Sequence, residues 1–189
     1  MSYLQIIAAI IGIGTNIPLI VGIFRNKIKQ SFAAFFLWGM LDIIAGITTY
    51  LQDGNYYLSA GYGISAITVA VCLVIKKQVS WTLVESFTLL LVACCLVIWA
   101  TSGERAGIIA SSLAVVIAGI PQMVDTYKDP STTPKVLYCF FLFANSLSLV
   151  AGKAWTIEER FYAGCVTLLT IIILVFSFRK VITPISAPS

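Results

Sequence analysis

Seven continuous apolar stretches constrain the fold of this chain more than any other feature. They occupy approximately residues 3–24, 32–51, 56–75, 80–100, 106–127, 135–152 and 161–178. A helix needs roughly 20 mostly apolar residues to cross the hydrocarbon core of a bilayer. Transmembrane β-strands instead alternate lipid-facing and lumen-facing residues over about ten positions, and these stretches do not alternate. The pattern therefore predicts an all-α integral membrane protein with seven transmembrane helices.

The composition leaves little material for a domain outside the membrane. Of the 189 residues, 59% are hydrophobic and only 11% are charged, whereas soluble domains have roughly half and a quarter. Histidine is absent, which removes the usual base at physiological pH and the commonest metal ligand. The chain also lacks the G-x-S-x-G elbow and the G-x-x-x-x-G-K-[ST] phosphate loop. We therefore expect a chain that is not an enzyme and that needs no cofactor and no metal.

The basic residues divide unevenly between the two ends of the predicted helices. Three of them (Arg105, Lys153 and Arg160) lie at one end, and nine lie at the other. The nine are Arg25, Lys27, Lys29, Lys76, Lys77, Lys128, Lys135, Arg179 and Lys180. Because cytoplasmic loops carry the excess of Lys and Arg, we expect the N-terminus outside and the C-terminus in the cytoplasm. The short loops and the lack of an organelle signal favour a bacterial inner membrane, with the lipid bilayer and no nucleic acid as partner.

An internal repeat relates the two parts of the chain. A shift of 103 residues pairs Ile17-Pro18 with Ile120-Pro121, Ala60-Gly61 with Ala163-Gly164, Asp42 with Asn145, and Trp38 with Phe141. Three spans end on the side opposite to their start, so one extra helix is needed to give a second copy the same orientation. We therefore expect two parallel three-helix repeats, at 1–78 and 105–180. An inverting transmembrane helix at 79–104 joins them, and a disordered tail follows at 181–189.

This layout resembles the PQ-loop family, which includes the SWEET sugar facilitators, the half-size SemiSWEETs and the cystinosin-type lysosomal transporters. The resemblance covers essentially the whole chain and is carried by Gly-Ile-Pro-Gln at residues 119–122, with Pro18 at the equivalent site of the first helix. It implies a 3+1+3 helix arrangement and transport by alternating access. The first helix departs from the family pattern, since Leu19 follows Pro18. Gly61 and Gly164 stand at or near the positions of the sugar-contacting asparagines, so the chain does not resemble a typical sugar SWEET.

Asp42 is the sharpest candidate for a functional residue. It lies near the middle of the second apolar stretch, where an ionised carboxylate costs about 2.5–3.5 kcal/mol even on translocon-insertion scales. An aromatic residue precedes the polar residue by one turn in both repeats, which suits a central cavity with polar contacts and ring stacking. The candidate substrate-binding residues are Trp38, Asp42, Phe141, Asn145, Gly61, Gly164 and Tyr62. The alternative is that Asp42 and the glycines serve helix association.

Two further roles follow from the same residues. Burial favours the neutral form of a carboxyl group, so Asp42 is also the candidate proton-coupling residue. Pro18 and Pro121 predict kinks that act either as paired hinges or as static bends, and the Gln122 amide is placed to bond a carbonyl freed by the kink. Of the tyrosines near the outer ends, Tyr162 is expected in the interfacial aromatic belt.

These features predict a secondary transporter or facilitator of a small polar solute, which is a sugar, an amino acid, a vitamin or a nucleoside-like molecule. Binding near the midplane and rocking of repeats is the general scheme for such proteins. Uniport and proton symport through Asp42 remain alternatives within this class. A non-transporting membrane receptor or a lipid scramblase of the same fold is the alternative outside it.

Overall fold

The computed structural model describes residues 2–26, 31–79, 81 and 83–179, and within these ranges the chain folds into helices with no β-strand. The prediction of an all-α chain is thereby confirmed for the described residues. The helices are α1 (Ser2–Gly14), α2 (Ile17–Phe24), α3 (Phe32–Leu51), α4 (Tyr57–Ile75), α5 (Leu83–Ser102), α6 (Glu104–Ala118), α7 (Ile120–Lys128), the 3₁₀ turn η1 (Pro130–Thr132), α8 (Lys135–Val150) and α9 (Ile157–Ser177). Lys27, Lys29, Lys180 and the tail predicted at 181–189 lie outside the described residues.

Five helices of the described part are long and apolar enough to cross a membrane. They are Tyr3–Phe24, Phe32–Leu51, Tyr57–Ile75, Glu104–Lys128 and Ile157–Ser177, where the first and fourth each join two successive helical segments. Two other apolar helices, Ser86–Ser102 and Lys135–Val150, are shorter. At 1.5 Å per residue, the 16 residues of α8 span roughly 24 Å. The long apolar helices indicate a membrane protein.

Two helices begin earlier than the apolar pattern predicts. The start of α9 is Ile157, four residues before the predicted residue 161, and its first turn contains Glu158 and Glu159. In the same way, α6 begins at Glu104, directly after Gly103 in the left-handed region at φ 82°. Acidic side chains are favourable in the first turn because the N-terminal end of a helix carries partial positive charge. The predicted boundaries were wrong here because hydropathy alone places charged residues in loops.

The two predicted proline kinks appear as interruptions between successive helices. In the first, Pro18 lies in the first turn of α2, and the Asn16 amide donates to the Ile13 carbonyl. In the second, Pro121 lies in the first turn of α7, and the Gly119 amide donates to the Val116 carbonyl. Each pair spans three residues, which is the tighter 3₁₀ spacing. These donors and acceptors are related by the shift of 103 residues that relates the two prolines.

Polar contacts show which helix ends meet. Gln5, in the first turns of α1, donates to the carbonyl of Ala151, which directly follows α8. The side chain of Asn55, between α3 and α4, donates to Ser148 near the end of α8. The backbone N–H of Asn55 donates to the Glu158 carbonyl. Arg105, at the start of α6, forms an ion pair with Glu158 at 3.0 Å. Therefore α1, α4, α6 and α9 all begin at one end of the bundle, which we call the bridged end.

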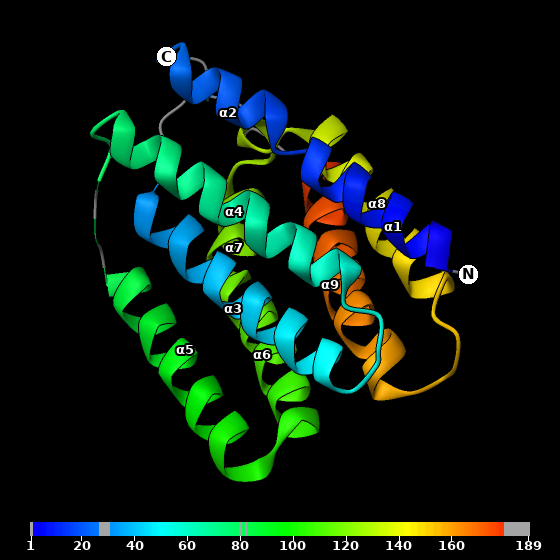
Figure 1. Cartoon of the computed structure of the whole chain (residues 1–189). Helices are drawn as coiled ribbons and strands as arrows, with labels where there is room; N and C mark the ends of the chain where they lie inside the picture. The colour runs from blue at the N-terminus through cyan, green and yellow to red at the C-terminus, as the bar shows by residue number, and fades with distance from the viewer. Residues whose placement is uncertain (1, 27–30, 80, 82, 180–189) are drawn as a thin grey trace, which may run out of the picture.

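The helices that precede α5 in the chain pack in the same pattern as the helices that follow it. Helix α4 packs against α1 and α3, and α9 packs against α6 and α8. Between these two groups, α1 packs on α8 and α3 packs on α6. Figure 1 shows α1 and α8 at one edge of the bundle, and α5 at the opposite edge beside α3 and α6. We refer to α1–α4 as the first half and to α6–α9 as the second half.

One apolar core joins the halves. Its buried side chains include Leu37 and Leu41 from α3, Val115 from α6 and Val166 from α9. Small residues bring the backbones together: a Cβ added at Gly107 of α6 would lie 2.7 Å from the Thr48 methyl group of α3. Close approach through small residues is typical of helix association in membranes. This core surrounds the polar side chains described next.

Candidate functional site

The Asp42 carboxylate lies inside the bundle and is bonded by a residue of the other half. Its relative exposure is 7%, and the hydroxyl of Tyr162 on α9 donates to Asp42 Oδ1 at 2.7 Å. Tyr162 is itself only 4% exposed. The prediction that Tyr162 belongs to an interfacial aromatic belt is therefore wrong, because its ring packs in the core shared by the two halves.

Asn145 of α8 has the reciprocal arrangement. The hydroxyl of Tyr62 on α4 donates to Asn145 Oδ1 at 2.6 Å. The Asn145 Nδ2 atom donates to Thr170 Oγ1 at 3.0 Å and to the Val166 carbonyl at 3.2 Å, both on α9. The side chain is 2% exposed, and its carbonyl oxygen and its amide nitrogen both have partners. Such satisfaction is what a buried amide requires.

We call Asp42, Tyr62, Asn145, Tyr162 and Thr170 the central polar cluster. In it, a tyrosine from each half donates to the polar residue of the other half. Asp42 and Asn145 are related by the shift of 103 residues, and each tyrosine lies one turn from the position equivalent to the other. The cluster thus connects the two halves near the middle of α3, through groups that an apolar environment makes costly to leave unpaired.

The aromatic candidates are divided by the structure. Phe141 packs edge-on against Tyr62, with ring centroids 5.7 Å apart, and so borders the central polar cluster. Trp38 is half-buried, contacts the shared core and packs edge-on against Phe35 at 6.2 Å. Phe141 therefore borders the central polar cluster, whereas the ring contact of Trp38 is with Phe35 on its own helix.

The two candidate glycines have different surroundings. A Cβ added at Gly61 would lie 3.3 Å from Ile13 and 3.4 Å from Ala9, both on α1. At Gly164 the nearest atom would be a Leu149 methyl at 3.9 Å, which is ordinary contact. Gly61 thus permits close packing of α4 on α1, whereas Gly164 leaves room for a larger residue.

The central polar cluster is bonded to itself across the two halves. The four side chains that make the two cross-half bonds occupy one another as hydrogen-bond partners at the place where the sequence predicts a cavity. Two grooves of the described part lie elsewhere. One runs along α7, α8 and α9, and the other lies between α5 and the junction of α6 with α7.

A polar contact also anchors the first interruption next to the cluster. Asn16 Nδ2 donates to Ser65 Oγ at 2.9 Å, and Ser65 Oγ donates to the Tyr62 carbonyl at 3.0 Å. At the second interruption, Gln122 Nε2 donates to Thr126 Oγ1 at 3.1 Å. The prediction that Gln122 bonds a carbonyl freed by Pro121 is therefore wrong, because its side-chain amide donates to Thr126, one turn further along α7.

Known proteins supply no comparison for this site, since no family model, no curated protein and no solved structure matches the chain. Among the described residues, no group of three or more His, Cys, Asp or Glu side chains is placed to hold a metal ion. The arrangement allows other hydrogen-bond donors to replace the two tyrosine hydroxyls at Asp42 and Asn145.

Sequence reasoning found Asp42, Asn145 and Tyr62 but missed Tyr162 and Thr170. Tyr162, Val166 and Thr170 follow one another at four-residue spacing and therefore share one face of α9. Two polar residues on the inward face of an apolar helix are the signal that was available. It was overlooked because Tyr162 lies close to the predicted start of the helix, where tyrosines are common.

Proposed function

We propose that this chain is a seven-helix transporter in which two parallel three-helix repeats move a small polar solute by alternating access. The observation that carries the proposal is the pair of reciprocal hydrogen bonds at Asp42 and Asn145. A carboxylate and an amide from opposite halves converge at mid-depth, and each is bonded by a hydroxyl that a solute is able to replace. Sites of this kind lie near the midplane between repeats in many transporters.

Three observations support the repeat. Helices of the two halves pack in equivalent pairs, α1 on α4 and α6 on α9, with α1 on α8 matching α6 on α3. The helices are interrupted at equivalent residues, Asn16 and Gly119. Finally, the Lys76 ammonium lies 5.9 Å from the Phe24 ring, and the Arg179 guanidinium lies 4.2 Å from the Tyr127 ring. Both members of the second pair are 103 residues beyond those of the first.

The charges around the site constrain how the Asp42 carboxylate is balanced. Every basic residue lies outside the apolar stretches or, in the case of Lys135, at the first residue of one, so no Lys or Arg of this chain is expected beside Asp42 near the middle of its helix. Asp42 must therefore take up a proton or keep a hydrogen-bond donor, first from Tyr162 and then from the solute, because an unpaired ionised carboxylate is costly in a low dielectric. Either route gives Asp42 the central role, as proton-coupling residue or as the partner of a polar group on the solute.

The test is uptake by proteoliposomes of a mixture of isotope-labelled sugars, amino acids, vitamins and nucleosides, read by mass spectrometry. We expect one solute class to enter faster than in protein-free vesicles, with Asp42→Asn reducing its uptake at least about tenfold. A tenfold change corresponds to about 1.4 kcal/mol, the low end for a hydrogen bond to a charged group. The matched control is Glu104→Gln at the bridged end.

Proton coupling is decided in the same vesicles. If Asp42 couples transport to protons, an inward proton gradient stimulates the wild type and Asn145→Ala but not Asp42→Asn. Equal stimulation of the wild type and Asp42→Asn would remove Asp42 as the coupling site. Flipping of labelled lipid without uptake of any solute would contradict the transporter and favour the scramblase.

A further inference from the structure

A groove at one end of the second half has features that the proposed transport does not use. It encloses about 650 Å³ between α7, α8 and α9, which lies within the range of roughly 300–1,000 Å³ for ligand sites. Its walls are apolar and include Leu142, Ile171, Val175 and Phe178. Val175 and Phe178 are more than half exposed, so the groove lies on the outer surface of the bundle, where lipid chains surround a membrane protein.

Two cations stand at the end of this groove. Arg179, which directly follows the α9 cap, lines it together with Tyr127. Its guanidinium lies over the Tyr127 ring and donates to the Tyr127 carbonyl. The Lys135 ammonium lies 5.1 Å from the centroid of the Phe178 ring, which is part of the groove wall. A positive charge pair thus caps an apolar trough, and the chain places both charges at the end that the positive-inside rule assigns to the cytoplasm.

We infer that this groove binds an anionic phospholipid, with an acyl chain along α8 and α9 and the phosphate between Arg179 and Lys135. An apolar trough fits an acyl chain and not a free anion, while the cations fit a phosphate. Arginine offers a planar set of donors that matches phosphate oxygens. The Tyr127 contacts hold the guanidinium in place before lipid arrives. The site does not depend on the proposed transport.

The first half provides an internal comparison. Phe24 and Lys76, at the positions equivalent to Tyr127 and Arg179, keep the contact between ring and cation. The residue equivalent to Leu142, however, is Gly39, where an added Cβ would lie 2.8 Å from the Ile67 side chain. The first half is therefore closely packed at the position where Leu142 lines the groove of the second half. Lys76→Gln is therefore the matched control, since it removes the equivalent cation in the half that carries Gly39 in place of Leu142.

The experiment uses the full chain in nanodiscs and measures bound lipid by native mass spectrometry. The probes are phosphatidylglycerol and phosphatidylcholine with identical acyl chains, and inorganic phosphate alone. We expect phosphatidylglycerol to be retained over phosphatidylcholine, and each of Arg179→Gln and Lys135→Gln to lower that preference by about fivefold. Lys76→Gln should leave the preference unchanged.

A second variant separates the groove from its cations. Val175→Trp fills the trough while Arg179 and Lys135 remain, so it should lower the retention of both lipids. Each variant is accepted only if its unfolding temperature in detergent matches that of the wild type. Equal retention of the two lipids by the wild type, or an equal loss of preference in Lys76→Gln, would overturn the proposal. Binding of inorganic phosphate that matches the lipid and survives in Val175→Trp would make this a simple anion site and would overturn it too.

Discussion

The two ends of the bundle are held together in different ways. At the bridged end, side chains connect the first half to the second, with Gln5 and Asn55 donating to Ala151 and Ser148. At the opposite end, which we call the basic end, the contacts of Lys76 and Arg179 stay within one half, on Phe24 and Tyr127 respectively.

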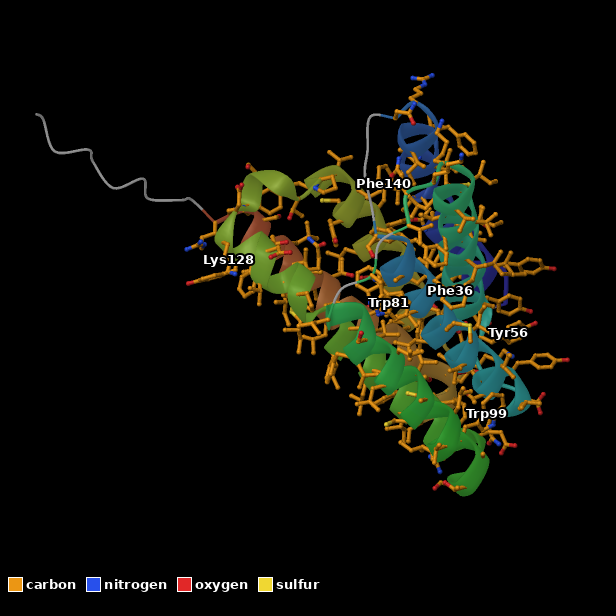
Figure 2. The ribbon with its side chains drawn as sticks, turned by 90° about the vertical axis from the view of Figure 1, so that its left-hand side faces the viewer. Phe36, Tyr56, Trp81, Trp99, Lys128 and Phe140 are labelled. Carbon is orange, nitrogen blue, oxygen red and sulfur yellow. The ribbon has the colours of Figure 1, made fainter. Side chains whose placement is uncertain are left out.

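The contacts of the segments beyond the proline interruptions follow the same division into halves. Helix α2 packs against α4 and α7 packs against α9, so each segment beyond a proline interruption belongs to its own half. In Figure 2 the end of α7, marked by Lys128, lies at the left of the view and the blue ribbon of α2 lies at the top, so the two segments diverge. The buried bonds of the bridged end must break before the halves separate there, whereas the contacts between rings and cations travel with their own half. Opening the bridged end is therefore the costly step for the rocking that we propose.

The largest expected effect on the free energy of unfolding is at Glu159, a buried carboxylate of the bridged end. This side chain is 8% exposed, and its Oε2 atom accepts from the Lys153 amide at 2.9 Å and from Gln5 Nε2 at 3.3 Å. Glu159→Ala leaves two donors without their acceptor, and we expect it to lower the free energy of unfolding by about 1–3 kcal/mol. The measurement is denaturant unfolding in detergent micelles.

The matched control for this prediction is Glu104→Ala. Glu104 also lies in the first turn of a helix at the bridged end, but its contact with Gln52 is 3.5 Å long and exposed. A loss at Glu159 no larger than the loss at Glu104 would mean that the buried bonds do not hold this end closed.

Hydropathy was sufficient for the helical class, because long apolar runs such as the one around Asp42 lack the alternation that barrel strands require. The repeat alignment pointed to Asp42 and Asn145 together, and both are buried. What the sequence did not reveal is which hydroxyls bond them, since Tyr162 reaches Asp42 across 120 residues of chain. The roles of Gln5 and Glu159 were also missed, because a contact between the start of α1 and the start of α9 depends on how the halves pack.

An intermediate effect is expected in the central polar cluster, which lies between the two ends. Tyr162→Phe removes the donor to Asp42, and Tyr62→Phe removes the donor to Asn145. Each should lower the free energy of unfolding by about 0.5–1.5 kcal/mol. The double variant, measured in the same micelles, tests whether the two bonds open together. An interaction free energy above about 0.5 kcal/mol means that they are coupled, and strict additivity means that they open independently.

The smallest expected effect is at the basic end, within the first half. A double-mutant cycle of Lys76→Met and Phe24→Leu should give a coupling of about 0.5–1 kcal/mol, as is usual for an exposed contact between a cation and a ring. Because both residues belong to one half, this coupling should be the same in the wild type and in the Glu159→Ala background, where the bridged end is weakened. Denaturant unfolding of the wild type and its seven variants measures both cycles. A coupling that changes with Glu159 would show that the basic end responds to the bridged end, and the halves would then not move as independent units.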